Sequence, residues 1–195
     1  MAIPPMLCIQ RPNPIKEHHL MKITTVLAPA AIFVLAMPTH AQDATASFID
    51  SDGAQVGSVT LTRGDGGVTI EGHLMGISAG EHGFHFHATG DCDPGSAFES
   101  AGDHFNPTDH QHGLENPQGP HSGDLPNVTA AEDGTVAVDL TTDMISLTEG
   151  DPAYVFDADG TALVVHAGPD DMVTDPSGNS GDRIACAVIG APAAL

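Results

Sequence analysis

The segment Gly83-Phe-His-Phe-His87 places two histidines two residues apart. Side chains alternate between the two faces of a β-strand, so His85 and His87 would share one face while Phe84 and Phe86 would share the other. Two imidazoles on the same face of a strand can bind one metal ion together. For this segment alone, a solvated strand face that carries two histidines is the alternative interpretation.

Further potential metal ligands are concentrated in two stretches downstream. His104, His112, His121 and Asp124 fall within residues 88–124, and His166 follows an apolar run and precedes residues 167–182. Zinc sites are tetrahedral and combine imidazole with thiolate or carboxylate, whereas Cu(II) favours a tetragonal set of nitrogens. The residue types therefore allow two sites, one built mainly of imidazole and one that includes a carboxylate.

Short segments rich in β-forming residues must position these side chains. The expected strands cover residues 44–49, 56–61, 68–75, 136–140, 163–165 and 184–189. Turn signals such as Asp52-Gly53 and Asp133-Gly134 separate them, and no segment shows a sustained helical period. The pattern predicts an all-β antiparallel sandwich or barrel. Residues 88–124 and 167–182 are long, polar and rich in glycine and proline, so we expect them to be functional loops.

The N-terminal region has the features of a targeting segment. Lys22 precedes an apolar stretch, residues 23–37, which leads to the small-residue site Thr39-His40-Ala41. This predicts a secretory signal peptide cleaved after Ala41, with a buried helix as the alternative. We expect residues 1–41 to be a leader and 42–195 a single domain of a periplasmic or secreted protein. Met21-Lys22 would be a natural start of the signal, which makes residues 1–20 a candidate artefact of start-codon choice.

The charge and the cysteines narrow the class of protein. The chain has 26 Asp and Glu against five Lys and Arg, a formal net charge of -21, and only Arg63 and Arg183 are basic beyond residue 41. A nucleic-acid or anionic-membrane partner is therefore not expected. No run of 18 apolar residues predicts a membrane span. Cys92 and Cys186 lie in the exported part, and their even number favours one disulfide.

Six segments of the chain share an order and spacing with a known family. They are Gly83-Phe-His-Phe-His87, Gly90-Asp-Cys92, Ser100-Ala-Gly-Asp-His-Phe-Asn-Pro107, His121-Ser-Gly-Asp-Leu125, Leu163-Val-Val-His166 and Gly178-Asn-Ser-Gly-Asp-Arg-Ile-Ala-Cys186. They resemble the signature segments of Cu,Zn superoxide dismutase, over about Ala44 to Ile189. The resemblance implies a Greek-key eight-stranded antiparallel barrel or sandwich with two long functional loops. It also implies an enzyme that disproportionates superoxide to dioxygen and hydrogen peroxide through copper redox chemistry.

The resemblance assigns roles to individual residues. Copper would be held by His85, His87, His104 and His166. Zinc would be held by His104, His112, His121 and Asp124, so that the His104 imidazolate bridges both metals. Cys92 and Cys186 match the family's disulfide, and Arg183 matches the arginine that binds the anionic substrate beside copper. Asp170 matches the carboxylate that links a copper ligand to a zinc ligand, here His85 and His112.

Several of these side chains also have simpler interpretations. His82 lies an odd number of residues from His85 and His87, which predicts the opposite strand face and a structural hydrogen bond. Spacing alone does not choose between His110 and His112, and the family pattern selects His112, leaving His110 a solvated loop residue. His73 is expected on the surface or barrel wall. Arg183 could instead pair with Asp182, and Asp170 could be an ordinary solvated acid.

Two other functions stay open on the residues alone. A non-enzymatic copper or zinc carrier could use the same fold, but it could dispense with Arg183 and a bridging ligand. A cupin-type oxygenase needs a glutamate soon after the histidine pair, and residues 88–95 contain none. Family members commonly place lysines around the copper channel, and this chain has none there, while Glu99 and Asp103 precede His104. Fast electrostatic steering is therefore not expected. A homodimer is an open option, because no interface is identifiable from sequence.

Overall fold

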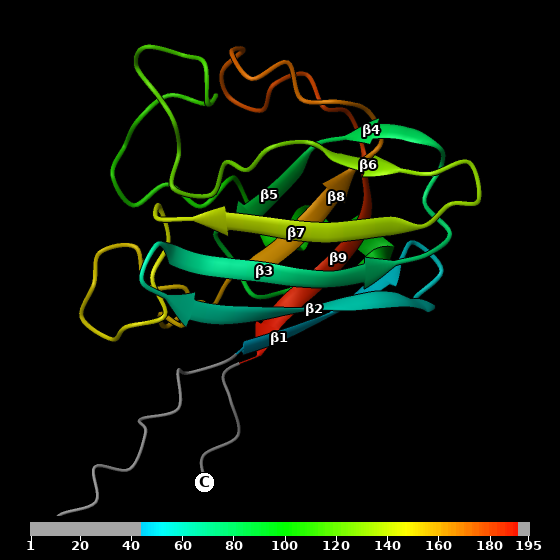
Figure 1. The fold of residues 1–195 in the computed structure, drawn as a ribbon, viewed down its shortest axis with the longest axis horizontal. Coiled ribbons are helices and arrows are strands. Elements are labelled where there is room, and N and C mark those ends of the chain that lie inside the picture. The colour runs from blue at the N-terminus through cyan, green and yellow to red at the C-terminus, as the bar shows by residue number, and fades with distance from the viewer. Residues whose placement is uncertain (1–43, 191–195) are drawn as a thin grey trace, which may run out of the picture. The chain divides into compact units, whose positions relative to one another are not determined.

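A computed structural model describes residues 44–190 of the chain (Figure 1). This region is all-β, with two short 3-10 helices, η1 (Pro94–Ser96) and η2 (Glu99–Ala101). The strands are β1 (Ala44–Asp50), β2 (Gln55–Gly64), β3 (Gly67–Leu74), β4 (Gly80–His82), β5 (Phe84–His87), β6 (Val128–Ala130), β7 (Val136–Thr142), β8 (Ala162–His166) and β9 (Arg183–Gly190). Within this region, no helix has the length and apolar character that crossing a membrane requires.

Residues 80–87 close the sheet into a barrel. The strand order is β4-β6-β7-β3-β2-β1-β9-β8-β5, and every pairing is antiparallel. Because β4 and β5 are separated only by Gly83, one continuous segment pairs with β6 at one edge and with β8 at the other. The nine strands thus become eight when this segment is counted once, which confirms the expected eight-stranded antiparallel barrel.

Two connections cross an end of the barrel, as a Greek key requires. Residues 75–79 carry the chain from β3 to β4, and residues 143–161 carry it from β7 to β8. The expected long loops are the β5–β6 connection, residues 88–127, and the β8–β9 connection, residues 167–182. They lie side by side at one end of the barrel, where Glu115 N–H donates to Met172 O at 2.9 Å (Figure 1). The long third loop, residues 143–161, was not anticipated from the sequence.

The barrel core forms where alternate strand residues face inward. In β1, Ala44, Ala46 and Phe48 are buried while the residues between them are exposed. Phe48 meets Phe84 of β5 with ring centroids 6.0 Å apart. The core is otherwise mostly aliphatic, and full burial of each Leu, Ile or Val side chain stabilises the fold by about 1.5–3 kcal/mol. This packed barrel is the rigid support from which the long loops extend.

A disulfide ties the first long loop to the barrel. Cys92 in the β5–β6 loop is bonded to Cys186 of β9, across a sequence separation of 94 residues. Cys186 is buried beside Phe98, Ala162 and Val164 in a small second core beneath the loop. The pairing expected for these two cysteines is confirmed.

Removing this crosslink should destabilise the fold. The chain-entropy argument gives about 4–5 kcal/mol for a closed loop of this length. We therefore expect Cys92→Ser to lower the free energy of unfolding by a few kcal/mol, measured by denaturant unfolding under non-reducing conditions. Reduced wild-type protein is the control and should unfold like the variant. Equal stability of the oxidised wild type and the variant would contradict this account.

Candidate metal centre

Strand β5 presents its histidines on the face away from the core. Phe84 and Phe86 join the barrel core, while His85 and His87 face the long loop, as the alternation predicts. All four side chains are buried, which excludes the solvated-face alternative. The loop lies along β5 through isolated β-bridges that pair His85 with Asp124 and His87 with His104. Loop residues distant in sequence are thereby placed beside the two strand histidines.

Glycine permits this close approach of loop and strand. Phe86 N–H donates to Gly123 O at 2.9 Å, Gly123 N–H donates to Phe105 O at 2.8 Å, and Phe105 N–H donates to Phe86 O at 2.8 Å. A Cβ at Gly123 would clash with the Phe86 carbonyl oxygen. Gly123, which the sequence analysis did not single out, therefore lets His121 and Asp124 reach β5.

Four histidines form the first buried cluster. His85, His87, His104 and His166 each direct a ring nitrogen to a common region in which all four atoms lie within 4.8 Å of one another. His87 Nδ1 donates to Gly102 O at 2.8 Å, and His166 Nδ1 donates to Gly181 O at 3.0 Å. Their Nε2 atoms, 3.4 Å apart, are thus the atoms left to bind a metal.

The second cluster is built around one carboxylate. His104, His112, His121 and Asp124 also place their ligand atoms within 4.8 Å of one another. Asp124 Oδ1 lies 2.9 Å from His112 Nδ1, 3.1 Å from His104 Nδ1 and 3.5 Å from His121 Nδ1. Its Oδ2 accepts N–H bonds from Gly113 at 2.8 Å and His121 at 3.0 Å, which fixes the carboxylate. His104 belongs to both clusters.

Asp170 connects the two clusters from outside. Its Oδ2 lies 2.6 Å from His85 Nε2 and 2.9 Å from His112 Nε2. The Asn127 side chain holds the Asp170 backbone, donating to its carbonyl and accepting from its N–H, both at 2.9 Å. Asp170 is buried, so the solvated alternative is excluded.

Gly178 leaves the space that this contact needs. Its φ of +63° is in the left-handed region, and a Cβ there would overlap the Asp170 carboxylate and lie 2.7 Å from His112 Nε2. Neither Gly178 nor Asn127 was identified as functional from the sequence. The sequence gives no sign that Gly178 must leave room for a buried aspartate, because that aspartate lies in another part of the loop.

The donor atoms of both clusters fit metal ions. Four buried nitrogens make no hydrogen bond of suitable geometry with the described residues: His85 Nδ1, His104 Nε2, His112 Nδ1 and His121 Nδ1. The last two lie 2.9 and 3.5 Å from Asp124 Oδ1, the carboxylate oxygen of the same cluster. Buried polar atoms are normally paired, and an unpaired one costs about 1–3 kcal/mol. The first two belong to the all-histidine cluster and the last two to the carboxylate cluster. An all-nitrogen set suits copper, and three nitrogens with one carboxylate suit zinc.

Burial favours the neutral, metal-binding form of most of these imidazoles. It lowers the pKa of His85 and His87, and brings the pKa of His104 to about 4 and of His166 to about 3. Burial also acts to lower the pKa of His112, but the Asp124 and Asp170 carboxylates outweigh it and raise that pKa to about 9. Burial acts to raise the pKa of Asp124, yet its bonds from the histidines hold that pKa well below the ordinary value.

Arg183 of β9 stands beside the all-histidine cluster. Its Nη1 donates to Phe98 O at 2.7 Å and its Nη2 to Gly102 O at 2.8 Å. Gly102 O also accepts from His87 Nδ1, so one carbonyl positions both side chains. The acid nearest the guanidinium is Glu99 at 3.7 Å, and not Asp182, the partner considered from the sequence. With its side chain 13% exposed, Arg183 borders an open hollow that also reaches His87, His104 and His166.

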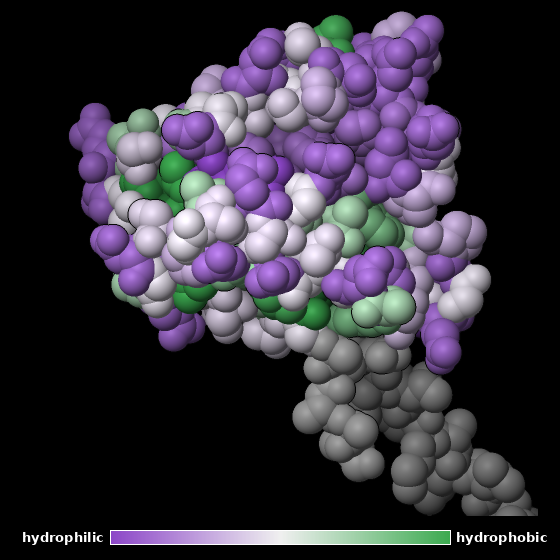
Figure 2. All heavy atoms as spheres, turned by 180° about the vertical axis from the view of Figure 1, so that it is seen from behind, coloured by the Kyte–Doolittle hydropathy of each residue, from purple (hydrophilic) through white to green (hydrophobic). Residues whose placement is uncertain are grey.

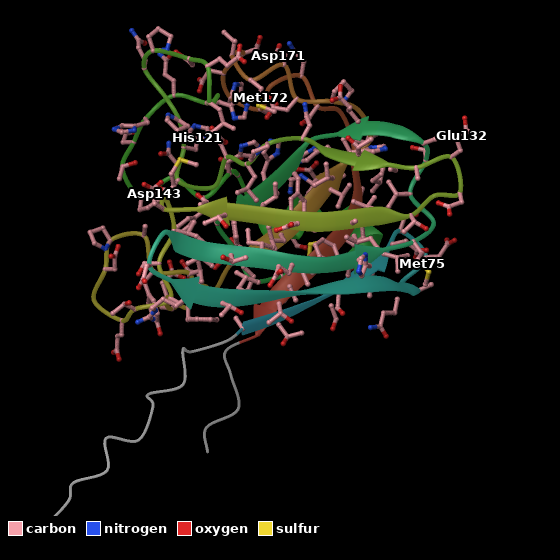
Figure 3. All side chains as sticks on the ribbon, viewed as in Figure 1. Met75, His121, Glu132, Asp143, Asp171 and Met172 are labelled. Atoms are coloured by element: carbon pink, nitrogen blue, oxygen red, sulfur yellow. A yellow bond between two sulfur atoms is a disulfide. The ribbon has the colours of Figure 1, made fainter. Side chains whose placement is uncertain are left out.

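The remaining histidines take structural or surface positions. His82 is buried outside both clusters, and its ring nitrogens each lie 2.7 Å from a backbone oxygen, of Ser78 and His166. This confirms the structural hydrogen bonding expected for it. His110 and His73 are exposed, also as expected. Figure 3 shows His121, Asp171 and Met172 at the loop end of the barrel, and Figure 2 shows hydrophilic residues gathered over that end.

Comparison with known proteins gives one consistent family. Residues 55–189 match the family described as copper/zinc superoxide dismutase (SODC). Superoxide dismutase [Cu-Zn] 2 of Aquifex aeolicus (strain VF5) is 40% identical over 171 residues, 87% of this chain and 99% of the relative. Superoxide dismutase [Cu-Zn] of Caulobacter vibrioides (strain ATCC 19089 / CIP 103742 / CB 15) is 44% identical over 149 residues, 75% of this chain and 84% of the relative.

Solved structures agree with this assignment. A SOD-like protein from Bacillus subtilis superimposes with a TM-score of 0.71 at 37% identity, covering 74% of this chain and 96% of that one. A structure titled as the clock protein EA4 gives a TM-score of 0.65 at 36% identity, covering 78% and 96%. The family match spans most of the described region, and that region contains both an all-histidine cluster and a histidine–aspartate cluster. The chain belongs to the copper/zinc superoxide dismutase family.

Proposed function

We propose that His85, His87, His104 and His166 bind copper, and that His104, His112, His121 and Asp124 bind zinc. The observation that carries this assignment is the pair of buried clusters that share His104 and leave four nitrogens without a hydrogen bond of suitable geometry. With these metals bound, the chain is a superoxide dismutase. Copper held there would supply one-electron redox chemistry, and in the overall reaction two superoxides and two protons yield dioxygen and hydrogen peroxide.

Arg183 binds the anionic substrate next to the copper ligands. A guanidinium stays protonated and offers several N–H donors in a fixed plane. Two of these donors hold Phe98 O and Gly102 O, which orients the group toward the hollow. The remaining donors can hydrogen-bond one oxygen of superoxide close to the histidines.

His104 moves a proton at its Nε2 atom. Its Nδ1 faces Asp124 in the proposed zinc set, while its buried Nε2 is left for the copper set, and the side chain lines the hollow that substrate would enter. The ring is held on the zinc side, so Nε2 can take up and release a proton without losing its position. Asp170 supports this arrangement because it orients His85 and His112 through their outer nitrogens.

The carrier alternative receives no support from these contacts. A storage or transfer protein needs neither a ligand shared by two metals nor an arginine held at the cluster mouth. Here both His104 and Arg183 are positioned by several separate contacts.

We infer that the protein is exported, to the periplasm or the outside of the cell. The disulfide is typical of oxidising compartments, and the relatives reported above are bacterial. The signal peptide assigned to residues 1–41 lies outside the described residues. It stays a prediction, as does the mature domain of residues 42–195. Homodimerisation also stays a prediction, which sedimentation of the metal-loaded chain would test.

Metal content and activity test the function directly. We expect the purified chain to bind one copper and one zinc and to dismutate superoxide, measured by metal analysis and pulse radiolysis. His104→Gln should lose activity and weaken binding of both metals, because one ring serves both sites. His73→Gln, which alters an exposed histidine on β3, is the matched control. An active His104→Gln chain with both metals at full occupancy would refute the shared-ligand assignment.

Arg183→Glu should separate substrate binding from metal binding. Reversing this charge removes the anion's binding partner, so we expect kcat/KM to fall about tenfold or more, equivalent to about 1.4 kcal/mol or more. Copper content should fall much less. Arg63→Glu makes the same charge change at an exposed position of β2 and should leave kcat/KM nearly unchanged. Parallel losses of copper and activity in Arg183→Glu would instead indicate a structural role.

The salt dependence of dismutation follows from the acidic surface. Charges beyond about 8 Å are screened at 0.15 M ionic strength, so salt weakens the distant carboxylates more than the nearby metals and Arg183. We expect the rate constant to stay flat or rise between low and moderate salt, measured by pulse radiolysis. A steep fall would show that a net positive field guides superoxide to the site.

A further inference from the structure

We propose that the mouth of the metal centre is a cation-collecting surface that accelerates delivery of metal ions to the metal-free histidine clusters. The inference rests on the proposed metal sites and adds a function for the residues around their entrance. The mouth is defined as the rim of an open hollow of about 1200 Å³ that reaches His87, His104, His121 and His166.

The rim carries many carboxylates and one cation. Seven Asp or Glu residues line the hollow, and Arg183 is the single Lys or Arg among its lining residues. The acids come from all three long loops: Glu99 and Asp103 from the β5–β6 loop, Asp157 from the β7–β8 loop, and Asp175 from the β8–β9 loop. These four side chains are exposed. A negative rim contributed by three separate segments surrounds the entrance.

The buried end of the hollow supplies the ligand atoms. His104 Nε2 and His121 Nδ1 are buried, have no hydrogen-bond partner among the described residues, and belong to side chains that line the same hollow. The two side chains are 5% and 8% exposed. A cation drawn to the rim therefore meets unpaired nitrogens at the base. This continuity of rim and ligands distinguishes the mouth from a solvated acidic face.

Arg183 does not neutralise the rim. Two of its donors are used by Phe98 O and Gly102 O, and Glu99 lies 3.7 Å from it. None of the other six lining carboxylates pairs with a Lys or Arg among the described residues, and Asp175 lies 3.8 Å from His121 Nε2. Clefts lined by one sign of charge raise association rates of opposite charges by 10–1000-fold, and the gain falls with ionic strength. For a divalent cation the attraction per carboxylate is twice that for a monovalent one.

The same rim opposes superoxide at long range, so the two reactions of this centre should respond to salt in opposite directions. Copper uptake by the metal-free chain should slow as salt rises, while dismutation by the loaded chain should not. This opposition is expected of a negative field at the mouth. Because carboxylates elsewhere on the acidic chain would contribute to the same field, the test compares the removal of mouth carboxylates with the removal of carboxylates elsewhere.

Stopped-flow mixing of the metal-free full chain with excess Cu(II) would test the inference, with uptake followed by the visible absorption of copper–imidazole coordination. The mouth variant is Glu99→Gln/Asp103→Asn, which removes two exposed carboxylates next to the copper set. The matched control is Glu71→Gln/Glu132→Gln, with the same charge change at exposed positions elsewhere, Glu132 lying at the other end of the barrel from His121 (Figure 3).

We expect wild-type uptake to slow by about threefold or more between 10 and 150 mM salt, as screening of a charged cleft requires. The mouth variant should take up Cu(II) about threefold or more slowly at low salt and show a weaker salt dependence, while the control should match the wild type. Final copper content should be equal in all three chains. Equal uptake rates for the two double variants, or a wild-type rate independent of salt, would overturn the inference while leaving the proposed function intact. A wild-type chain that binds no copper would overturn both.

Discussion

The alternation of side chains along β5 is the constraint on which the whole centre depends. Over four residues this strand sends Phe84 and Phe86 into the barrel core and His85 and His87 toward the loops. The same segment closes the barrel, since β4 and β5 pair with opposite edges of the sheet. The histidines are therefore fixed by core packing and by strand pairing together. A one-residue slip in register would exchange phenylalanines for histidines and destroy both the core and the site.

The loops then complete the site through the second nitrogen of each ring. His85 and His112 are oriented by Asp170, His87 by Gly102 O and His166 by Gly181 O. Each anchor fixes which nitrogen faces inward toward the cluster. The Gly102 carbonyl has a further consequence, because it also accepts from Arg183. One backbone atom thus positions both Arg183, the proposed substrate-binding group, and His87, a proposed copper ligand.

Most of the strands and most of the candidate site were predictable from the sequence, and the features that were missed have physical reasons. Strand signals predicted β1, β2, β3, β7, β8 and β9 to within a few residues, but β4 and β6 are only three residues long and too short to show a period. The residue types predicted two metal sites, and the resemblance to the family supplied the individual ligands, since spacing alone did not choose between His110 and His112. Gly123, Gly178 and Asn127 were missed, because their contribution is room or a backbone contact, which depends on residues far away in the chain. The disulfide was predictable because Cys92 and Cys186 are the two cysteines that follow the predicted leader.

The charges around the site act over two distances: Arg183 and the metals attract an anion at short range, and the rim carboxylates attract a cation at long range. Arg183 and the metals act over a few ångströms, where the solvent and salt between partners are largely excluded. The carboxylates of the rim lie farther out and are exposed, so their influence is strongest on ions that have not yet entered. Because no lysine lines the hollow, superoxide is not attracted at long range, whereas a metal cation is attracted by the carboxylates. Because the proposed ligand nitrogens are buried beneath an open hollow with an acidic rim, arrival of the metal is a step that such a field can govern. Superoxide close to the site responds mainly to Arg183 and the metals.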